Sequence, residues 1–445
     1  MPMLWCRAAM GMDSEHSKRF EAYIDLMADA LGHADRREPM RAYCEGLVLP
    51  GERKSVEPMA ARVDPLHVRS RHQSMHHFVA DSPWRDEDVL RVAREWALEA
   101  METQGSLEAW IVDDTGFPKK GSHSVGVTHQ YCGALGKTTN SQCAVSVSLA
   151  NRVSSVPAAF RLYLPEGWAG DMERREHVGV PASVTFKTKW KIALDLIDHL
   201  VEEGVQKVTI LADAGYGDAT PFREGLTERG FRYAVGICSK ITVWVHGTGP
   251  RVPEAKPGKR GRPAMRLKHD ANHQPMSVLE VAKSLPSGAW SQVAWAEGTR
   301  GKLRSRFAAL RIRVASRDHK RTEPRSEEWL LIEWPEREPE PIKYWLSTES
   351  EDIELTVLVA KAKLRWRVER DYQELKDEIG LDHYEGRGWR GFHHHASLCI
   401  ATYAFLVAER TRLSPPSPAA LLGLAQPAIS VVPRGRPAPR KGGQA

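Results

Sequence analysis

The sequence of 445 residues contains little cysteine and no long apolar run. Its six cysteines show no CxxC spacing, which argues against a zinc module or a disulfide framework and favours a reducing cytosol. No apolar stretch approaches the roughly 18 residues of a membrane span. The first residues, MPMLWCRAAMGM, lack the apolar core and cleavage site of a signal peptide. The cysteines are Cys6, Cys44, Cys132, Cys143, Cys238 and Cys399.

The overall composition is that of a soluble globular protein with a slight excess of basic residues. Apolar residues make up 42% and charged residues 27%, and the net charge is +6. This charge favours a polyanionic partner only mildly. The length suits two or three domains, or one large domain with insertions.

The first hundred residues have a helical pattern and include a basic segment. This segment could dock on a DNA backbone, or it could belong to a solvated helical domain; the residues leave both interpretations open. Its basic residues and histidines are Arg53, Lys54, Arg62, Arg69, Arg71, His72, His76 and His77.

The next region alternates strands with a helix, and two of its strands end in acids. EAWIVDDT ends in Asp113 and Asp114, and VTILADAGYGD is an apolar strand ending in Asp213. A helix is predicted between them, over 186–203. Several strands, a helix and another strand indicate a mixed α/β fold.

The stretch from Leu364 to Ile379 predicts an amphipathic helix with two stripes. Leu364, Val368, Leu375 and Ile379 recur at helical spacing and would face a core. A second, polar stripe would hold Arg365, Glu369, Tyr372 and Lys376. A carboxylate between two cations suits a site that handles a metal and phosphates, although an exposed salt-bridged helix face would show the same pattern.

Asp113, Asp213 and Glu369 could converge on a pair of metal ions. Carboxylates without cysteine or histidine ligands suit Mg²⁺ or Mn²⁺ better than zinc. Two such ions about 4 Å apart can activate an attacking oxygen and stabilise a leaving oxygen in phosphoryl displacement. Each acid alone is a weak signal, because an aspartate at the end of a strand is more often a turn or cap residue.

Three stretches together resemble the DDE transposases of bacterial insertion sequences, and most closely the insertion sequence 701 family. They are VDDTGFPKKG, LADAGYGD and RWRVERDYQELKDEIGLDHYEGRGWRGFHHH. The resemblance covers about residues 20–410. It implies an RNase H-like α/β core with a mixed sheet flanked by helices and a β-rich insertion before the last catalytic acid. We therefore expect a basic helical DNA-binding region (1–105), the core in two parts (106–237 and 346–413), the insertion (238–345) and a basic, disordered tail (414–445).

The resemblance also assigns roles along the signature Tyr-x2-Arg-x3-Glu-x6-Lys. Arg365, Glu369 and Lys376 match its last three members, whereas Ala362 stands at the tyrosine position. It implies that Glu369 binds metal with Asp113 and Asp213, and that Arg365 and Lys376 contact DNA phosphates. The departure at Ala362 removes any role of a tyrosine in holding a phosphate.

The first acid is ambiguous, because strand alternation points Asp113 and Asp114 to opposite faces. The Asp-x-Ser/Thr pattern of this fold favours Asp113, with Thr115, over Asp114. Asp213 is preferred over Asp218, which lies beyond a glycine turn and is expected to cap a helix.

Other basic residues are candidates for DNA contact. Lys119 and Lys120 follow the first strand, where a solvated turn is an equal alternative. Arg260 and Arg262 belong to an Arg-Gly-Arg-Pro tetrapeptide that recurs at 434–437 and could enter an A·T-rich minor groove. Arg304 and Arg306 alternate with Arg300 and Lys302 along a strand and could form a basic ridge.

Three further sets of residues have structural interpretations beside functional ones. His383, Glu385 and Arg387 are expected to support the site without performing chemistry. The neighbouring histidines 393–395 cannot share one helical face, which argues against a metal site. Trp290 or Trp295 could receive a flipped base, although a buried structural tryptophan is the better interpretation for each.

Taken together, these features predict a bacterial transposase. It would bind terminal inverted repeats in double-stranded DNA, form a synaptic homodimer, and use two Mg²⁺ ions, or Mn²⁺, for strand cleavage and strand transfer into target DNA. It would work in the cytoplasm at the nucleoid, without contact to membranes. A catalytically inactive, domesticated DNA-binding relative is one alternative. A two-carboxylate glycosidase is another, but it would leave the basic stretches unexplained.

Overall fold

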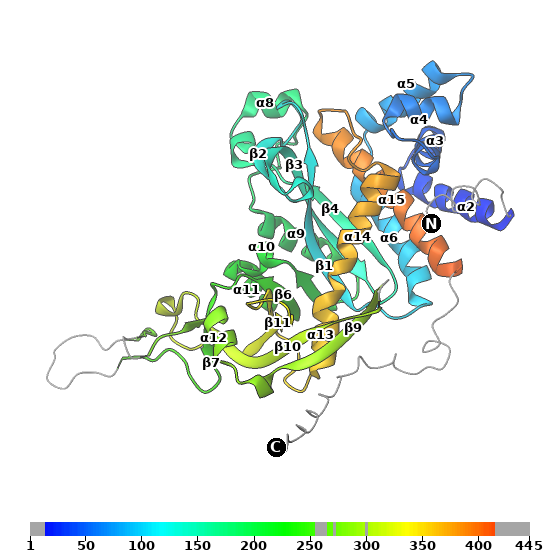
Figure 1. Ribbon diagram of the computed structural model, residues 1–445. Helices are drawn as coiled ribbons and strands as arrows, with labels where there is room; N and C mark the ends of the chain where they lie inside the picture. Colours follow the sequence, from blue (N-terminus) through cyan, green and yellow to red (C-terminus); the bar gives the residue numbers. More distant parts are fainter. Residues whose placement is uncertain (1–13, 254–264, 270–272, 299–300, 414–445) are drawn as a thin grey trace, which may run out of the picture. The chain divides into compact units, whose positions relative to one another are not determined.

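The computed structural model describes residues 14–253, 265–269, 273–298 and 301–413 (Figure 1). These residues form two compact units. The first comprises the chain up to Ile210 and again from Leu364, and the second comprises the chain from Leu211 to Lys363. Each unit is described separately below.

The first unit begins with helices, as the pattern of the first hundred residues predicts. Buried apolar side chains such as Tyr23, Met40 and Phe78 form their core. The last long helix of the chain, α15 (Trp389–Leu413), packs against α6 and also contacts α2, α3 and α5. The N-terminal elements are α2 (Ser14–Ala30), η1 (Ala34–Arg36), α3 (Arg37–Val48), α4 (Val56–Val63), α5 (Val68–Ala80) and α6 (Asp86–Glu102).

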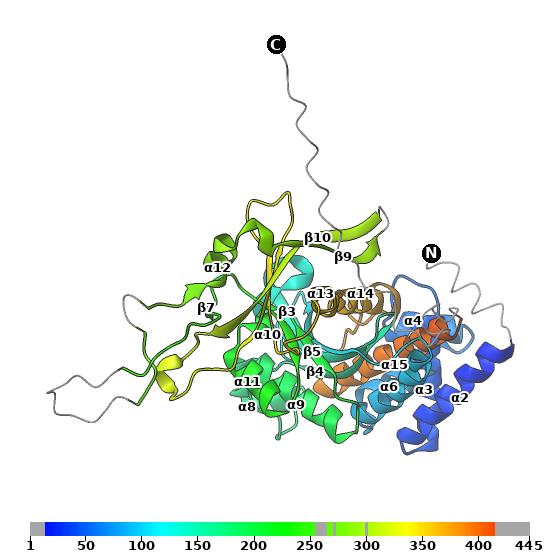
Figure 2. The same ribbon diagram turned by 90° about the horizontal axis from the view of Figure 1, so that it is seen from below.

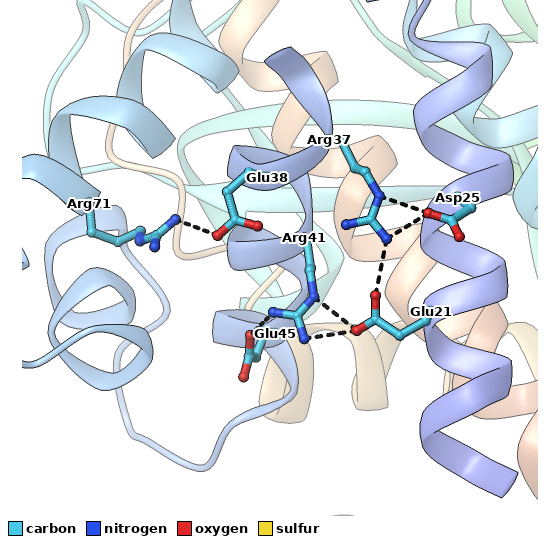
Figure 3. A network of polar contacts seen from close by, with 7 residues as sticks. All are labelled: Glu21, Asp25, Arg37, Glu38, Arg41, Glu45 and Arg71. Atoms are coloured by element: carbon cyan, nitrogen blue, oxygen red, sulfur yellow. Dashed lines mark hydrogen bonds and ion pairs between the residues drawn. The ribbon is translucent and has the colours of Figure 1, made fainter. Parts of the chain in front are cut away.

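Much of the basic charge in these helices is neutralised within the unit. Figure 3 shows Arg37, Arg41 and Arg71 each bound to carboxylates, which ties α3 to α2 and α5 to α3. Lys54 is buried and donates from Nζ to the carbonyl oxygen of Leu47 at 2.8 Å. The acids in the network are Glu21, Asp25, Glu38 and Glu45.

The sheet of the first unit is built around the strand that carries Asp113. β1 (Ala109–Pro118) pairs antiparallel with β3 (Lys137–Ala150), and Asp113 lies opposite Ser146. The other side of β3 pairs with β2 (Thr128–Cys132) and β4 (Ser155–Leu162). In the strand order, β1 is followed by β5 (Thr209–Ala212), whose first two residues belong to this unit.

Helices flank this sheet, so the predicted α/β class, with a sheet flanked by helices, is confirmed. α9 (Lys189–Glu202) contacts β3 and β4, and α15 and α6 contact β4. α9 is shorter than the predicted helix over 186–203. Its short neighbours are η2 (Gly133–Leu135), α7 (Glu166–Ala169) and α8 (Met172–His177).

The second unit contains the β-rich segment, as predicted. Its strands follow the order β6-β12-β11-β10-β7-β8. β9 pairs with β10, and the two strands lie next to each other in Figure 2. Helix α13 (Leu355–Leu364) contributes Leu358, Val359 and Ala362 to a core with Phe307 and Trp345. The remaining elements are α10 (Ala214–Gly217), α11 (Thr220–Glu228), β6 (Tyr233–Ile237), β7 (Thr242–Val245), β8 (Met276–Ser277), α12 (Val278–Ser284), η3 (Ser287–Ala289), β9 (Ser291–Gly298), β10 (Gly301–Val314), η4 (Asp318–Lys320), β11 (Glu328–Trp334) and β12 (Lys343–Ser347).

The helix predicted from Leu364 to Ile379 is interrupted. A turn at Arg365 separates α13 from α14 (Trp366–Glu374), and the chain then widens into a π-helical turn, η5 (Leu375–Ile379). Gly380 ends it with φ at +83°, where a Cβ atom would lie 2.5 Å from the Cβ of Lys54. This position therefore requires glycine.

The apolar stripe of this stretch is largely confirmed, but its polar stripe is not. Val368, Leu375 and Ile379 are buried and Leu364 is half-buried. Tyr372, which the helical spacing places on the polar stripe, is also buried. The reason is tertiary: α14 contacts both β1 and β4, so more than one face of the helix is covered.

Among the helices in the described residues, none has both the length and the apolar composition needed to cross a membrane.

Candidate active site

The two neighbouring aspartates of β1 have different partners. Asp114 accepts a hydrogen bond from Nζ of Lys189, at the start of α9, over 2.7 Å. Although burial opposes the charge of Lys189, the Cys143 thiol and the Asp114 carboxylate raise its pKa above the usual value. Asp114 is thus held in an ion pair.

Asp113 lies instead beside the residues of the catalytic signature. The Nη2 atom of Arg365 is 3.3 Å from Oδ2 of Asp113, and its Nη1 atom donates to Oε1 of Glu369 over 2.8 Å. The guanidinium therefore bridges two carboxylates that are far apart in sequence. Glu369 remains 56% exposed at the side chain, whereas Asp113 is only 14% exposed.

Tyr372 forms a buried neutral neighbour of this cluster. Its burial, with a smaller effect of the Asp113 charge, raises the pKa of the phenol well above its usual value. The phenol therefore stays protonated at physiological pH.

Lys376 links η5 to the strand of Asp113. Its Nζ donates to the carbonyl oxygen of Gly116 over 2.9 Å and lies 5.3 Å from the ring centroid of Phe117. Burial lowers the pKa of this lysine. The ammonium thus uses one of its three donors to bind the backbone of β1, and its contact with a DNA phosphate stays a prediction.

Asp213 follows β5 in the second unit. Its Oδ1 accepts a hydrogen bond from the backbone N–H of Tyr216 over 3.3 Å, which caps α10. The glycine turn after it is required by packing, because a Cβ atom at Gly217 would lie 1.8 Å from the carbonyl oxygen of Gly236.

The expectation that the Asp218 side chain caps the start of a helix is wrong. Its Oδ1 accepts a hydrogen bond from the backbone N–H of Cys238 over 2.8 Å, and α11 begins after Ala219 without a side-chain cap. Asp218 therefore joins the glycine turn to the end of β6.

Residues 26–302 match the family described as DDE superfamily endonuclease. The chain belongs to this family. It is also 34% identical over 172 residues to a probable transposase for insertion sequence element IS701 of Microchaete diplosiphon. That match covers 38% of this chain and 42% of the relative.

A solved structure of the piggyBac transposase synaptic complex with hairpin DNA was also found as a neighbour. It has a TM-score of 0.39 and 12% sequence identity, and the alignment covers 87% of this chain and 68% of that one.

DDE superfamily enzymes generally use divalent metals, and the carboxylates of this chain fit that chemistry. Asp113 and Glu369 offer the hard oxygen donors that Mg²⁺ prefers, and the guanidinium of Arg365 already holds a positive charge between them. In the described residues, however, no group of three or more histidines, cysteines or acids is gathered closely enough to hold a metal ion.

The histidine cluster at 393–395 consists of three separately bonded side chains. His393 contacts the backbone N–H of Leu162, and His394 contacts the carbonyl oxygen of Trp84. His395 contacts the hydroxyl of Tyr43. All three are buried, and burial lowers the pKa of each. These contacts fix α15 against its neighbours.

The other residues predicted to contact DNA differ in exposure and in hydrogen bonding. Lys120 and Arg304 are exposed, whereas Nζ of Lys119 donates to the carbonyl oxygen of Tyr384 over 2.8 Å. Arg306 is half-buried; its Nε donates to a carbonyl oxygen over 3.1 Å. Arg260, Arg262 and the tail at 414–445 lie outside the described residues.

The two tryptophans considered for a flipped base lie in the second unit. Trp290 is buried and meets Trp334 edge-on, with ring centroids 5.4 Å apart. Trp295 is half-buried against Phe307, and Nζ of Lys363 lies 4.3 Å from its ring centroid. These surroundings are those of packed residues.

Lys189 is a site residue that the sequence did not reveal. It lies 75 residues from Asp114 and belongs to a KTKWK run with three similar lysines. Only the packing of α9 on β3 and β4 selects Lys189 as the partner of Asp114.

Proposed function

We propose that this DDE endonuclease is a DNA transposase that cuts and joins the ends of an insertion sequence. The observation that carries the proposal is the Asp113–Arg365–Glu369 bridge. It brings the strand acid and the helical acid of a DDE enzyme to one guanidinium. Asp114, the rival first acid, is occupied by Lys189.

In this proposal Asp113, Glu369 and Asp213 hold two Mg²⁺ ions, for which Mn²⁺ can substitute. When bound, the ions supply Lewis-acid stabilisation and lower the pKa of an attacking water. The convergence of Asp213 with the other two acids is part of the proposal, because Asp213 belongs to the second unit.

Arg365 has two roles in succession. Without metal, its guanidinium balances the charge of Asp113 and Glu369. If bound metal ions balanced the charge of these acids instead, the planar guanidinium could bind two oxygens of a DNA phosphate. The hydrogen bond from Lys376 to the carbonyl oxygen of Gly116 places this lysine beside β1, where it would add a point charge.

The reaction has two steps. Water attacks a phosphodiester at the end of the element, the bond from phosphorus to the 3′ oxygen breaks, and that oxygen takes up a proton to become a 3′-hydroxyl. This hydroxyl then attacks a phosphorus of the target DNA and displaces a second 3′ oxygen, so the number of phosphodiester bonds is unchanged. We infer that two copies act together on a pair of terminal inverted repeats, inside a bacterial cell.

The test is cleavage of a duplex carrying the repeats that border the coding sequence, with and without Mg²⁺. Wild type should cut at the end of the element, and Glu369→Ala and Asp213→Ala should not. Glu378→Ala is the matched control, because Glu378 is an exposed acid on the same helical stretch. If both site variants cut as well as wild type, the site is wrong. If wild type binds the duplex but never cuts in Mg²⁺ or Mn²⁺, the protein is an inactive relative.

A further inference from the structure

A polar cavity of about 450 Å³ lies in the first unit, and its lining does not include Asp113 or Glu369. Three segments build it: the chain before α4, the turn after β1, and the loop between η5 and α15. Four cations line it, together with two histidines and two acids. The charged and histidine residues are Arg53, Lys119, Lys120, His123, Asp382, His383, Glu385 and Arg387.

The cavity is held open by hydrogen bonds between its three segments. The backbone N–H of Lys54 donates to Nδ1 of His383 over 3.0 Å, and that of Val125 donates to the carbonyl oxygen of Arg387 over 2.9 Å. Nζ of Lys119 donates to the carbonyl oxygen of Tyr384 over 2.8 Å. A ligand would therefore meet a prearranged set of groups.

Its acids are partnered, but two of its cations are not. Glu385 pairs with Arg53 at 3.1 Å, and Asp382 lies 3.7 Å from Nε2 of His383. By contrast, the exposed side chains of Lys120 and Arg387 make no hydrogen bond or ion pair to any residue that the structure describes. The cavity thus presents uncompensated positive charge.

His383 adds a neutral donor to these cations. Because its Nδ1 accepts the N–H of Lys54, its proton lies on Nε2 when the ring is neutral. Cations with an added N–H donor match an anion that carries several oxygens. Small-molecule pockets are mostly apolar, whereas charged and polar residues line this cavity, and Tyr384 is the one large hydrophobic side chain in its described lining.

We propose that this cavity binds a phosphate of the DNA backbone at a fixed distance from the cut. Lys119 is the first residue after β1 and lies six residues beyond Asp113. An extended chain rises about 3.3 Å per residue, so the two residues are about 20 Å apart. A DNA strand has one phosphate per about 3.4 Å of helix axis, so for a duplex whose axis follows β1 we place this phosphate about six nucleotides from the cleaved bond. The proposal rests on the proposed function, since it takes Asp113 as the cutting site.

The first experiment measures how DNA affinity depends on salt. The double variant Lys120→Gln/Arg387→Gln removes the two unpartnered cations, and Lys18→Gln/Lys240→Gln removes the same charge from exposed lysines outside the cavity. Loss of one phosphate contact should reduce the slope of log affinity against log salt by about 0.9, which is about eightfold in affinity at 0.1 M salt. The control pair should leave the slope unchanged.

The second experiment locates the phosphate. A single neutral methylphosphonate is moved along each strand of the duplex, and binding is measured for wild type and for the cavity variant. A substitution about six nucleotides from the cut should weaken wild type about eightfold and leave the variant unaffected. A uniform loss along the strand, or equal losses in both proteins, would overturn the assignment.

These results separate the cavity from the active site. If wild type cuts the duplex and the cavity variant keeps the wild-type slope, the cavity proposal fails while the transposase proposal stands. If wild type neither binds nor cuts, the transposase proposal fails first. Calorimetry with inorganic phosphate tests the other source of the anion. If wild type binds phosphate, the cavity variant does not, and the salt dependence of DNA affinity is the same in both, the cavity takes free phosphate instead.

Discussion

Exchanging either β1 aspartate for asparagine should produce opposite phenotypes. Asp114→Asn should lower the stability of the protein and leave DNA cleavage intact, because the Asp114 carboxylate is held by Lys189 and Cys143. Asp113→Asn should nearly abolish cleavage and cost little stability, because Arg365 keeps its ion pair with Glu369 and the asparagine oxygen can still accept from the guanidinium. Lys189, by contrast, has no second carboxylate partner among the described residues.

The size of the stability effect follows from the burial of the ion pair. Exposed pairs contribute about 0–1 kcal/mol, and breaking a fully buried pair costs about 3–5 kcal/mol. Each side chain of the Asp114–Lys189 pair is 34% exposed. The loss should therefore be about 1–3 kcal/mol in the free energy of unfolding, or a few degrees in the midpoint of thermal unfolding.

The assays are thermal unfolding of both variants and cleavage of the end duplex. Removing a residue that only hydrogen-bonds a metal ligand costs about 10–100-fold, so loss of the Asp113 carboxylate itself should cost at least about 100-fold in cleavage rate. Lys189→Met completes a double-mutant cycle, in which the two changes should not add. Cleavage lost in Asp114→Asn and retained in Asp113→Asn would reverse the assignment of the first acid.

Three further predictions concern charge in the first unit. Arg365→Ala should bind Mn²⁺ more tightly than wild type in calorimetry, since its guanidinium no longer competes for the two acids, while cleavage falls; unchanged Mn²⁺ affinity would contradict this. Burial lowers the pKa of His393 to about 3 and of His395 to about 4. Their contribution to stability is therefore present above about pH 6.5 and is lost as pH falls, and the two together should lower the free energy of unfolding by about 4 kcal/mol at pH 5. Imidazole NMR signals that titrate near pH 6.5 would refute this. Burial raises the pKa of Asp371 to about 7, so its contribution is present below about pH 4 and lost as pH rises through 7; Asp371→Asn should be more stable than wild type at pH 8, and no gain in unfolding midpoint would count against it.

Local patterns were sufficient for the elements that carry the acids. The apolar run before Asp213 is β5, and the spacing of Val368, Leu375 and Ile379 marks the buried side of the helical stretch. The run before Asp113 is only the first part of β1, because the strand continues through both aspartates to Pro118 and does not end at them as predicted. These patterns are visible because strand and helix periodicity is a property of neighbouring residues.

Features that depend on distant partners were not visible. The turn at Arg365 and the π-helical turn after it have no sequence signal of their own, and the burial of Tyr372 depends on the sheet that covers it. Asp218 has the residue type and position of a helix cap, yet a backbone N–H 20 residues later binds its carboxylate. The cavity could not be predicted for the same reason, since its three segments are joined only by the fold.

The departure at Ala362 has a packing explanation that does not require loss of activity. Ala362 is 4% exposed and belongs to a core cluster of the second unit with Phe307, Trp345 and Leu358. A tyrosine there would add a large side chain to a filled space, and overpacking costs about 1–3 kcal/mol. The small residue thus fits the core of the β-rich unit. Arg365 lies about one turn further on and Glu369 about two turns, and these two side chains keep their contact with each other. The missing tyrosine is therefore better read as a change in the core than as decay of the site.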